Sequence, residues 1–409
     1  MSKLKTNTIQ HTGGSADNIT LDNSQNVTAE GNLTVDGNLT VSGTSTISGY
    51  HPTTSRSNRN LIINGAMQVN QRTSTSGLDD FNVVTGNLYT LDRWQGVGTS
   101  SFDWDSARIK QVSDSPDEFS NSLRVDIGNT ETPGAGQNGL VRTKIEAQDL
   151  QHLAYGTSSA KTCTLSFWVR SNKTGTYCVQ IQQRDADKHL LYEYSISSAN
   201  TWEKKTITFS GNTSDAITND NGIGFQIALH LACHSDDHES ATTSWAANSG
   251  GSLKATSNQV NLWDHADNVW YLTGVQLEVG NYATDFEHRK FQDELYNCQR
   301  YYQQVGTPTQ DGQFCIGASH LTSAGDQTRV GYFGQNNLRA TPTITEFGDG
   351  LRVIGSGSNT PALTMDDINV TFPSAFMQFN ATHTDIGDDN EIVVVTNTAN
   401  GGIKIEAEL

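Results

Sequence analysis

The segment TLSFWV at residues 164–169 decides the fold class, because apolar residues recur in it at every second position. Leu165, Phe167 and Val169 fall on one side of an extended chain, since successive strand residues point to opposite faces. This two-residue period predicts a β-strand that turns one face toward a hydrophobic core.

Similar short segments recur between residues 60 and 286. About eight or more short strands in such a stretch are typical of an antiparallel sandwich, and we predict a jelly-roll-like β-sandwich here. Residues 232–257 show no period and are interpreted as a long inserted loop. The clearest predicted strands are 122–127, 162–170, 177–182, 190–196, 202–209, 223–231 and 269–277.

A six-residue repeat precedes the sandwich. Residues 25–48 consist of the hexads QNVTAE, GNLTVD, GNLTVS and GTSTIS, with apolar residues concentrated at the third and fifth positions. One thin ribbon of this kind cannot bury its apolar edge, so we predict that residues 1–59 form a trimeric β-stem. A flexible Thr/Asn/Gly linker is the alternative interpretation. The stem core would consist of Leu33, Val35, Leu39, Val41 and Ile47.

A different period follows the sandwich. Large side chains recur there at alternating spacings of four and three, which predicts a helix at 287–305 with a coiled-coil-like seam. In a trimer this seam would face the other chains, and the alternative is a helix packed on its own domain. The seam residues are Phe291, Leu295, Cys298 and Tyr302.

Residues 306–409 return to β-strand patterns. This length is sufficient for a small distal β-sandwich, which we predict as the tip of the molecule. The predicted strands are 343–347, 351–354, 368–372, 376–379, 392–396 and 403–407.

The composition excludes several classes of protein. Asp and Glu number 44 against 26 Lys and Arg, a net charge of -18, so no basic face for nucleic acid is expected. No apolar stretch is long enough for membrane insertion, and because residues 1–10 contain no apolar segment we expect no secretory leader there. The five cysteines form no CxxC motif, which argues against a zinc ribbon or a disulfide framework and favours synthesis in the cytoplasm.

Potential ligands for a metal gather at residues 230–239, and His265 lies in a nearby polar stretch. Their spacing fits no standard motif, so we predict a solvated loop, no metal site and no cofactor. A structural calcium ion is the exception that the acidic segment 387–391 would allow.

Aromatic side chains are the natural contacts for a sugar. Trp245 and Trp263 lie in irregular segments, while Tyr332 and Phe347 lie in the last part of the chain. We predict these four as receptor contacts. No catalytic residue is predicted, because the separation of two carboxylates across a fold cannot be read from sequence.

Four segments of the sequence carry a resemblance to a known family. They are NLIINGAMQVNQR at 60–72, LDRW at 91–94, GVQLEVGNYATDFEHR at 274–289 and ELYNCQRYY at 294–302. Together they resemble the central domain of tail fibre proteins of tailed bacteriophages, including marine and cyanobacterial ones. KLKTNTIQ and the hexads resemble the shaft of such fibres. NLRATPTIT at 337–345 is similar to the opening of the tip domain, with Leu338 where the family usually has methionine.

The resemblance implies a homotrimeric, non-enzymatic fibre of the virion that is made in the host cytoplasm. Its N-terminus, with Lys3, Lys5 and Ile9, would dock on the phage tail, the baseplate or an adaptor protein. The rest of the chain would mediate adsorption to a host-surface glycan or protein. The alternative is a tailspike-like enzyme that depolymerises surface polysaccharide.

Overall fold

The computed structural model describes residues 8–9, 19–21, 27–29, 58–72, 81–82, 86–99, 102, 107–248, 254–305, 315–320, 328–333, 338–347, 351–354, 364–370, 376–382, 391–396 and 402–409. The chain divides into two compact units, Met1–Pro52 and Thr53–Leu409. No helix among the described residues is both long and apolar enough to cross a membrane.

In the first unit, three short strands pair in antiparallel order within one chain. They are β1 (Thr8–Ile9), β2 (Ile19–Leu21) and β3 (Val27–Ala29). The expected docking residue Ile9 belongs to β1, whereas Lys3 and Lys5 lie outside the described residues. The stem residues Leu33, Val35, Leu39, Val41 and Ile47 also lie outside them, so the trimeric stem stays a prediction.

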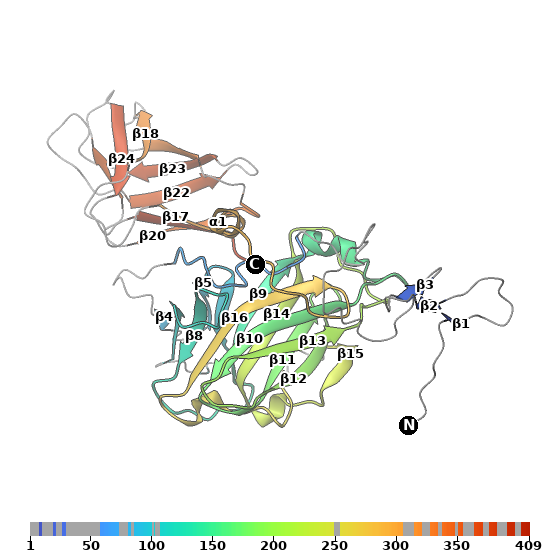
Figure 1. The fold of residues 1–409 in the computed structure, drawn as a ribbon. Helices are drawn as coiled ribbons and strands as arrows, with labels where there is room; N and C mark the ends of the chain where they lie inside the picture. Colours follow the sequence, from blue (N-terminus) through green and yellow to red (C-terminus); the bar gives the residue numbers. More distant parts are fainter. Residues whose placement is uncertain are drawn as a thin grey trace. The chain divides into compact units, whose positions relative to one another are not determined.

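The described part of the second unit contains a sandwich of two antiparallel sheets (Figure 1). One sheet has six strands in the order β13 (Glu203–Phe209), β10 (Cys163–Ser171), β16 (Val269–Val279), β8 (Ser122–Asp126), β7 (Arg108–Val112) and β4 (Phe81–Asn82). The other has seven, in the order β15 (Thr242–Ala247), β12 (Lys188–Ile196), β11 (Gly175–Gln183), β14 (Ile223–Cys233), β9 (Asn138–Glu146), β6 (Trp94–Gly98) and β5 (Gly86–Leu91).

The hydrophobic core lies between these sheets, as the two-residue period predicts. Leu165, Phe167 and Val169 are fully buried and belong to the same core cluster as Val179 and Ile181 of the other sheet. The predicted antiparallel β-sandwich is therefore confirmed, and the predicted strands correspond to β8, β10, β11, β12, β13, β14 and β16.

The expectation of a plain loop at 232–257 is wrong for its middle part. Residues 242–247 form β15, which pairs with β12 through Lys188↔Ala247 and Leu191↔Thr242. The register shifts between these pairs, and the strand lies at the edge of the sheet without a clean burial alternation. An edge strand gains its stability from the neighbouring strand, so its own sequence carries a weak signal.

The predicted helix is shorter in the structure. Helix α1 spans Phe291–Gln299, and the chain then forms strand β17 (Tyr302–Val305). The expectation of helix at 300–305 is wrong because β17 pairs with β25 (Gly402–Glu406), a strand about a hundred residues later.

Residues 315–396 contain further antiparallel strands, which confirms the predicted β character. Two three-stranded sheets are formed there by the described residues. They comprise β18 (Cys315–His320), β24 (Glu391–Thr396) and β21 (Leu351–Ile354), and β19 (Thr328–Phe333), β23 (Phe376–Thr382) and β22 (Thr364–Val370).

A third three-stranded sheet has the order β17, β25, β20, where β20 spans Thr343–Phe347. We call this sheet, together with the residues that follow β25, the neck. The buried guanidinium of Arg93 stacks 3.5 Å from the ring centre of Tyr301 and pairs with Glu408. Arg72 stacks 3.8 Å from the ring centre of Tyr302 and binds Glu408 at 2.7 Å. The neck thus fastens the last residues of the chain to the LDRW and QRYY segments.

Candidate functional site

Two of the segments that carry the resemblance, 60–72 and 274–289, contact each other at strand β16. The side-chain oxygen of Asn60 accepts hydrogen bonds from the backbone N–H groups of Ile62 (2.9 Å) and Leu277 (3.1 Å). Its amide donates to the carbonyl oxygen of Val275 at 3.0 Å. One asparagine therefore fixes the entering chain along the last strand of the sandwich.

The Asn64–Gly65 turn completes this junction. Asn64 has a φ of 57°, and its amide donates to the carbonyl oxygen of Asp92 at 2.9 Å. The indole of Trp94 donates to the carbonyl oxygen of Asn64 at 3.0 Å. A Cβ at Gly65 would lie 2.1 Å from the carbonyl oxygen of Val275, so only glycine fits this close backbone approach.

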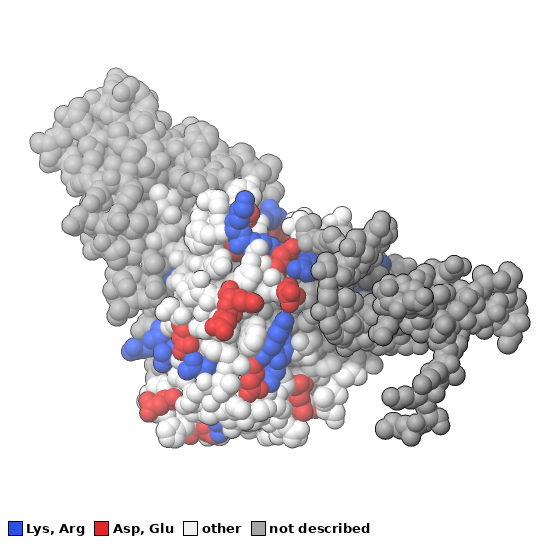
Figure 2. Space-filling model, in the orientation of Figure 1, with Lys and Arg blue, Asp and Glu red and all other residues white. Residues whose placement is uncertain are grey.

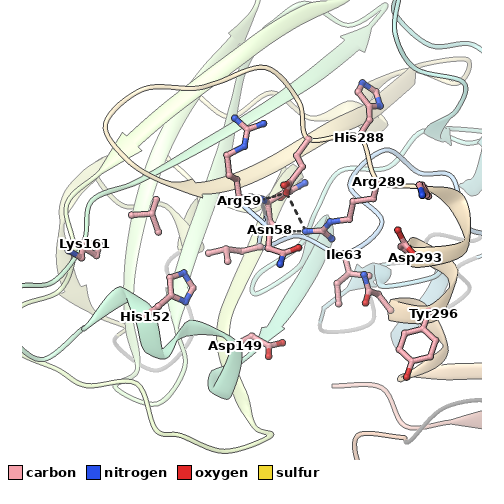
Figure 3. A pocket seen from close by; sticks show the side chains of 16 residues that line it. Asn58, Arg59, Ile63, Asp149, His152, Lys161, His288, Arg289, Asp293 and Tyr296 are labelled. Carbon is pink, nitrogen blue, oxygen red and sulfur yellow. Dashed lines mark hydrogen bonds and ion pairs between the residues drawn. The ribbon is translucent and has the colours of Figure 1, made fainter. Parts of the chain in front are cut away.

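An open pocket of about 1210 Å³ lies between this junction, the 3₁₀ helix η1 (Ala147–Leu153) and helix α1. We call it the α1 pocket. Figure 3 shows Asp149 and His152 on one side and Asp293 and Tyr296 on the other. Its wall also includes Asn58, Arg59, Lys161, Glu287, His288, Arg289 and Lys290.

Three charged side chains of this wall hold the loop that borders the pocket. Arg59 donates to the Thr284 hydroxyl at 2.7 Å, and Glu287 accepts the backbone N–H of Asn60 at 2.8 Å. Arg289 donates to the carbonyl oxygen of Asn60. These residues shape the pocket, and each of them forms at least one hydrogen bond within the protein.

Other groups of the wall face solvent. Asp149, His152, Lys161 and Asp293 are exposed, and Tyr296 of α1 is 58% exposed. Although Asp149 is exposed, the surrounding protein removes part of the water around its carboxyl, and this together with the negative charge of Glu146 raises its pKa.

The wall of the α1 pocket therefore carries an aromatic ring, carboxylates, an imidazole and an ammonium group. An aromatic ring can stack on the apolar face of a sugar, and the polar groups can bond its hydroxyls. The arrangement suits a hydrated, polar ligand.

The predicted receptor contacts lie elsewhere. Trp263 is only 1% exposed and packs edge-on against Phe102 in the core, so the expectation that it lies at the surface is wrong. Trp245 is partly buried, stacks on Phe225 and donates to the carbonyl oxygen of Ser210 at 2.9 Å. Tyr332 lies in β19 and Phe347 in β20, and their side chains lie outside the described residues.

The seam residues of the helix do not share one environment. Phe291 is exposed and Leu295 is partly buried, whereas Cys298 and Tyr302 are buried within the chain itself. Tyr302 lies in β17 against Arg72, as described for the neck. Within α1, Cys298 thus packs on its own chain, and Phe291 is left exposed for another contact.

The histidine-rich segment 230–239 is not arranged as a metal centre. Among the described residues, no group of three or more His, Cys, Asp or Glu side chains is placed to hold a metal ion. His230 is buried on β14, Asp237 pairs with Lys254 at 3.1 Å, and the His234 ring accepts the backbone N–H of Asp236. The segment 387–390 lies outside the described residues.

Sequence reasoning missed the α1 pocket because its residues come from distant segments. Asp149 and His152 lie on a 3₁₀ helix too short to show a period. Tyr296 lies off the predicted seam, and its place in the aromatic-rich segment ELYNCQRYY at 294–302 was the available signal.

Comparison with known proteins gives partial structural likenesses. The enzymatically active domain of a tailspike protein of bacteriophage CBA120 matches with 14% identity and a TM-score of 0.27, over 54% of this chain and 21% of that one. A family 4 carbohydrate-binding module matches with 14% identity and a TM-score of 0.28, over 53% and 98%. A family 22 module of Clostridium thermocellum Xyn10B matches with 12% identity and a TM-score of 0.26, over 47% and 89%. No family model and no curated protein matches the sequence.

Proposed function

We propose that the protein is a homotrimeric tail fibre of a tailed bacteriophage that binds a host-surface glycan through the α1 pocket. The supporting observation is the solvent-facing ring of Tyr296 in a pocket whose exposed side chains donate and accept hydrogen bonds. The sequence segments that resemble tail fibre proteins also contribute residues to this pocket and to the neck. The N-terminal unit would attach to the tail, and several weak sites in one virion would add up to firm adsorption.

The glycan site is tested with a matched pair of tyrosines. Tyr296 is 58% exposed and lines the pocket, whereas Tyr282 is 50% exposed and does not line it. The wild-type protein is applied to an array of bacterial capsule and lipopolysaccharide saccharides. We expect Tyr296→Ala to weaken binding of the recognised saccharide about tenfold or more, since about 1.4 kcal/mol corresponds to a factor of ten. Tyr282→Ala should bind like the wild type.

The site assignment is overturned if both variants bind like the wild type. Failure of the wild-type protein to bind any saccharide would contradict the glycan-binding function itself. The trimer is tested separately by light scattering, where a mass of a single 44.4 kDa chain would refute it.

A glycan-cleaving enzyme is the second candidate, and one observation favours it. Asp149 and Asp293 line the same pocket, and a pair of carboxyl groups is what glycosidases use to cleave a glycosidic bond. Incubation with the recognised polysaccharide distinguishes the two functions. Chain shortening by the wild type that is lost in Asp149→Asn would show an enzyme, whereas an unchanged chain length supports the adhesin.

A further inference from the structure

The charge of the α1 pocket differs from that of the whole chain. Four Lys and Arg residues line the pocket against three Asp and Glu residues, whereas the chain has 26 against 44. The four basic residues are Arg59, Lys161, Arg289 and Lys290, and the imidazoles of His152 and His288 lie in the same wall. A local excess of positive groups in so acidic a protein favours an anionic ligand.

Most of these groups are open to the pocket and to solvent. Lys161, Lys290 and the two histidines are exposed, and Arg59 is partly exposed. Among the described residues, neither lysine forms a hydrogen bond or an ion pair through its side chain. Both ammonium groups are therefore available to a ligand.

The positive charges at the pocket lack carboxylate partners within the chain. Arg59 donates to two neutral oxygens, the hydroxyl of Thr284 at 2.7 Å and the main-chain oxygen of Asp285 at 3.2 Å. Lys290 is the N-cap residue of α1, at the end of the helix where the dipole disfavours a positive charge. Neither residue forms an ion pair with a described carboxylate, so an anion at this place would stabilise both.

The carboxylates of the wall have other interactions or another place. Glu287 accepts the backbone N–H of Asn60 at 2.8 Å and lies 3.7 Å from the Arg289 guanidinium. Asp293 lies in the first turn of α1, where the helix dipole stabilises a negative charge. Asp149 lies away from the basic groups: Figure 3 draws Arg59 and His288 at the top of the pocket and Asp149 and Tyr296 at the bottom.

Elsewhere in the described sandwich, basic side chains lie beside carboxylates. Figure 2 shows basic and acidic side chains intermingled on the face that it draws. On the six-stranded sheet, Arg170 pairs with Asp114 at 2.7 Å and Lys205 with Glu203 at 2.6 Å. A chain of net charge -18 has more carboxylates than basic groups, so basic groups left without one around a pocket favour an anion supplied by the ligand.

We propose that the ligand of the α1 pocket is an acidic saccharide, one that carries carboxylate or phosphate groups. This rests on the proposed function, because it names the class of glycan that the pocket binds. The anionic groups would bind Arg59, Lys161 and Lys290, since charge-assisted hydrogen bonds to either anion are short and strong. The sugar hydroxyls would donate to Asp149, because an ionised carboxylate only accepts, and the ring would stack on Tyr296.

Matched saccharides that differ only in charge test the proposal, by calorimetric titration of the full chain. One pair is trigalacturonic acid and the galactotriose of the same linkage, in which each carboxylate is replaced by a hydroxymethyl group. The other pair is mannose 6-phosphate and mannose. We expect the charged member of at least one pair to bind at least about tenfold more tightly than the neutral member, and added salt to weaken it. A preference in the first pair alone identifies a uronic acid, and one in the second pair alone identifies a phosphorylated sugar.

Three variants locate the binding. Lys161→Gln and Lys290→Gln should each weaken the charged member about threefold to fivefold, and the double variant about tenfold or more, while galactotriose or mannose binds as before. Both lysines are exposed and form no bond in the described structure, so the melting temperature should not change. Lys204→Gln is the control, because it removes an exposed charge from β13 that does not line the pocket.

The proposal is overturned if neither charged probe binds, if the two members of each pair bind equally, or if the lysine variants bind like the wild type. An equal effect of Lys204→Gln would also overturn it, because the binding would then reflect overall charge. Its failure is distinguishable from that of the proposed function. A neutral saccharide that is recognised on the array and lost in Tyr296→Ala would refute the acidic ligand and leave the glycan site standing.

Discussion

Replacing Glu408 by glutamine should release the neck from the sandwich. Glu408 accepts from both Arg72 and Arg93, and its side chain is only 9% exposed. Glutamine has nearly the same shape, so the change removes the negative charge with little loss of packing. Arg93 would then be buried beneath Tyr301 without a carboxylate.

The structure sets the size of the effect. Removing one partner of a buried ion pair costs about 3–5 kcal/mol, because the other charge stays buried. Glu406 provides the matched control, since it also binds Arg72, at 2.8 Å, but its side chain is 36% exposed. An exposed pair contributes roughly 0–1 kcal/mol, so Glu406→Gln should change the neck little.

Hydrogen exchange of the β25 amides measures this difference locally. Ile403 and Ile405 pair with Val305 and Gln303 of β17, and their exchange reports opening of the neck. A loss of about 3–5 kcal/mol accelerates exchange by about two to three and a half powers of ten. For Glu406→Gln we expect at most about a fivefold change, and the amides of β10 should be unaffected by either variant.

Equal acceleration by the two variants would refute this reasoning, because the exposed fraction would then not determine the strength of the pair. Acceleration of less than about tenfold by Glu408→Gln would show that the neck is held by the β25 pairing and by aromatic stacking alone.

Three further changes test other parts of the molecule. His230 is buried and its pKa is lowered to about 3, so the unfolded chain alone gains a proton as the pH falls from about 6.5 toward 3, and folding weakens. His230→Leu removes this loss. The free energy of unfolding of the variant minus that of the wild type, measured in urea, should therefore be about 2–3 kcal/mol larger at pH 4.5 than at pH 7.5. A difference that does not change with pH would contradict the lowered pKa of His230. Gly65→Ala should cost at least about 1–3 kcal/mol because its Cβ meets the carbonyl oxygen of Val275, whereas Gly134→Ala meets only the flexible end of Gln137 and should leave the melting temperature nearly unchanged. Leu39→Asp would place a charge on the predicted stem axis, and light scattering should show loss of the trimer; an intact trimer would mean that the hexads are not its core.

The sequence predicts the sandwich well because local patterns specify it. The alternation in residues 164–169 requires an extended chain with one buried face, and the structure buries Leu165, Phe167 and Val169. The same reasoning fails at Tyr302, where helical spacing is overridden by pairing with Glu406 of β25. A seam of two heptads is a weak local preference that long-range strand pairing can outweigh.

The candidate sites depend almost entirely on tertiary structure. Residues 149, 152, 293 and 296 share one pocket although about 140 residues separate its two sides, and no local period connects them. Trp263 shows the converse, since an irregular segment suggested exposure but the fold packs the ring against Phe102.

The sequence by itself determined that this protein is an antiparallel β-sandwich with an excess of negative charge. It could do so because burial of alternate side chains and net charge are properties of the chain alone. Only the tertiary structure decided which charges are neutralised. Register and packing give Arg93 a carboxylate in Glu408 and leave Arg142 with the amide of Gln95, because the separation between two charged groups is fixed by the fold.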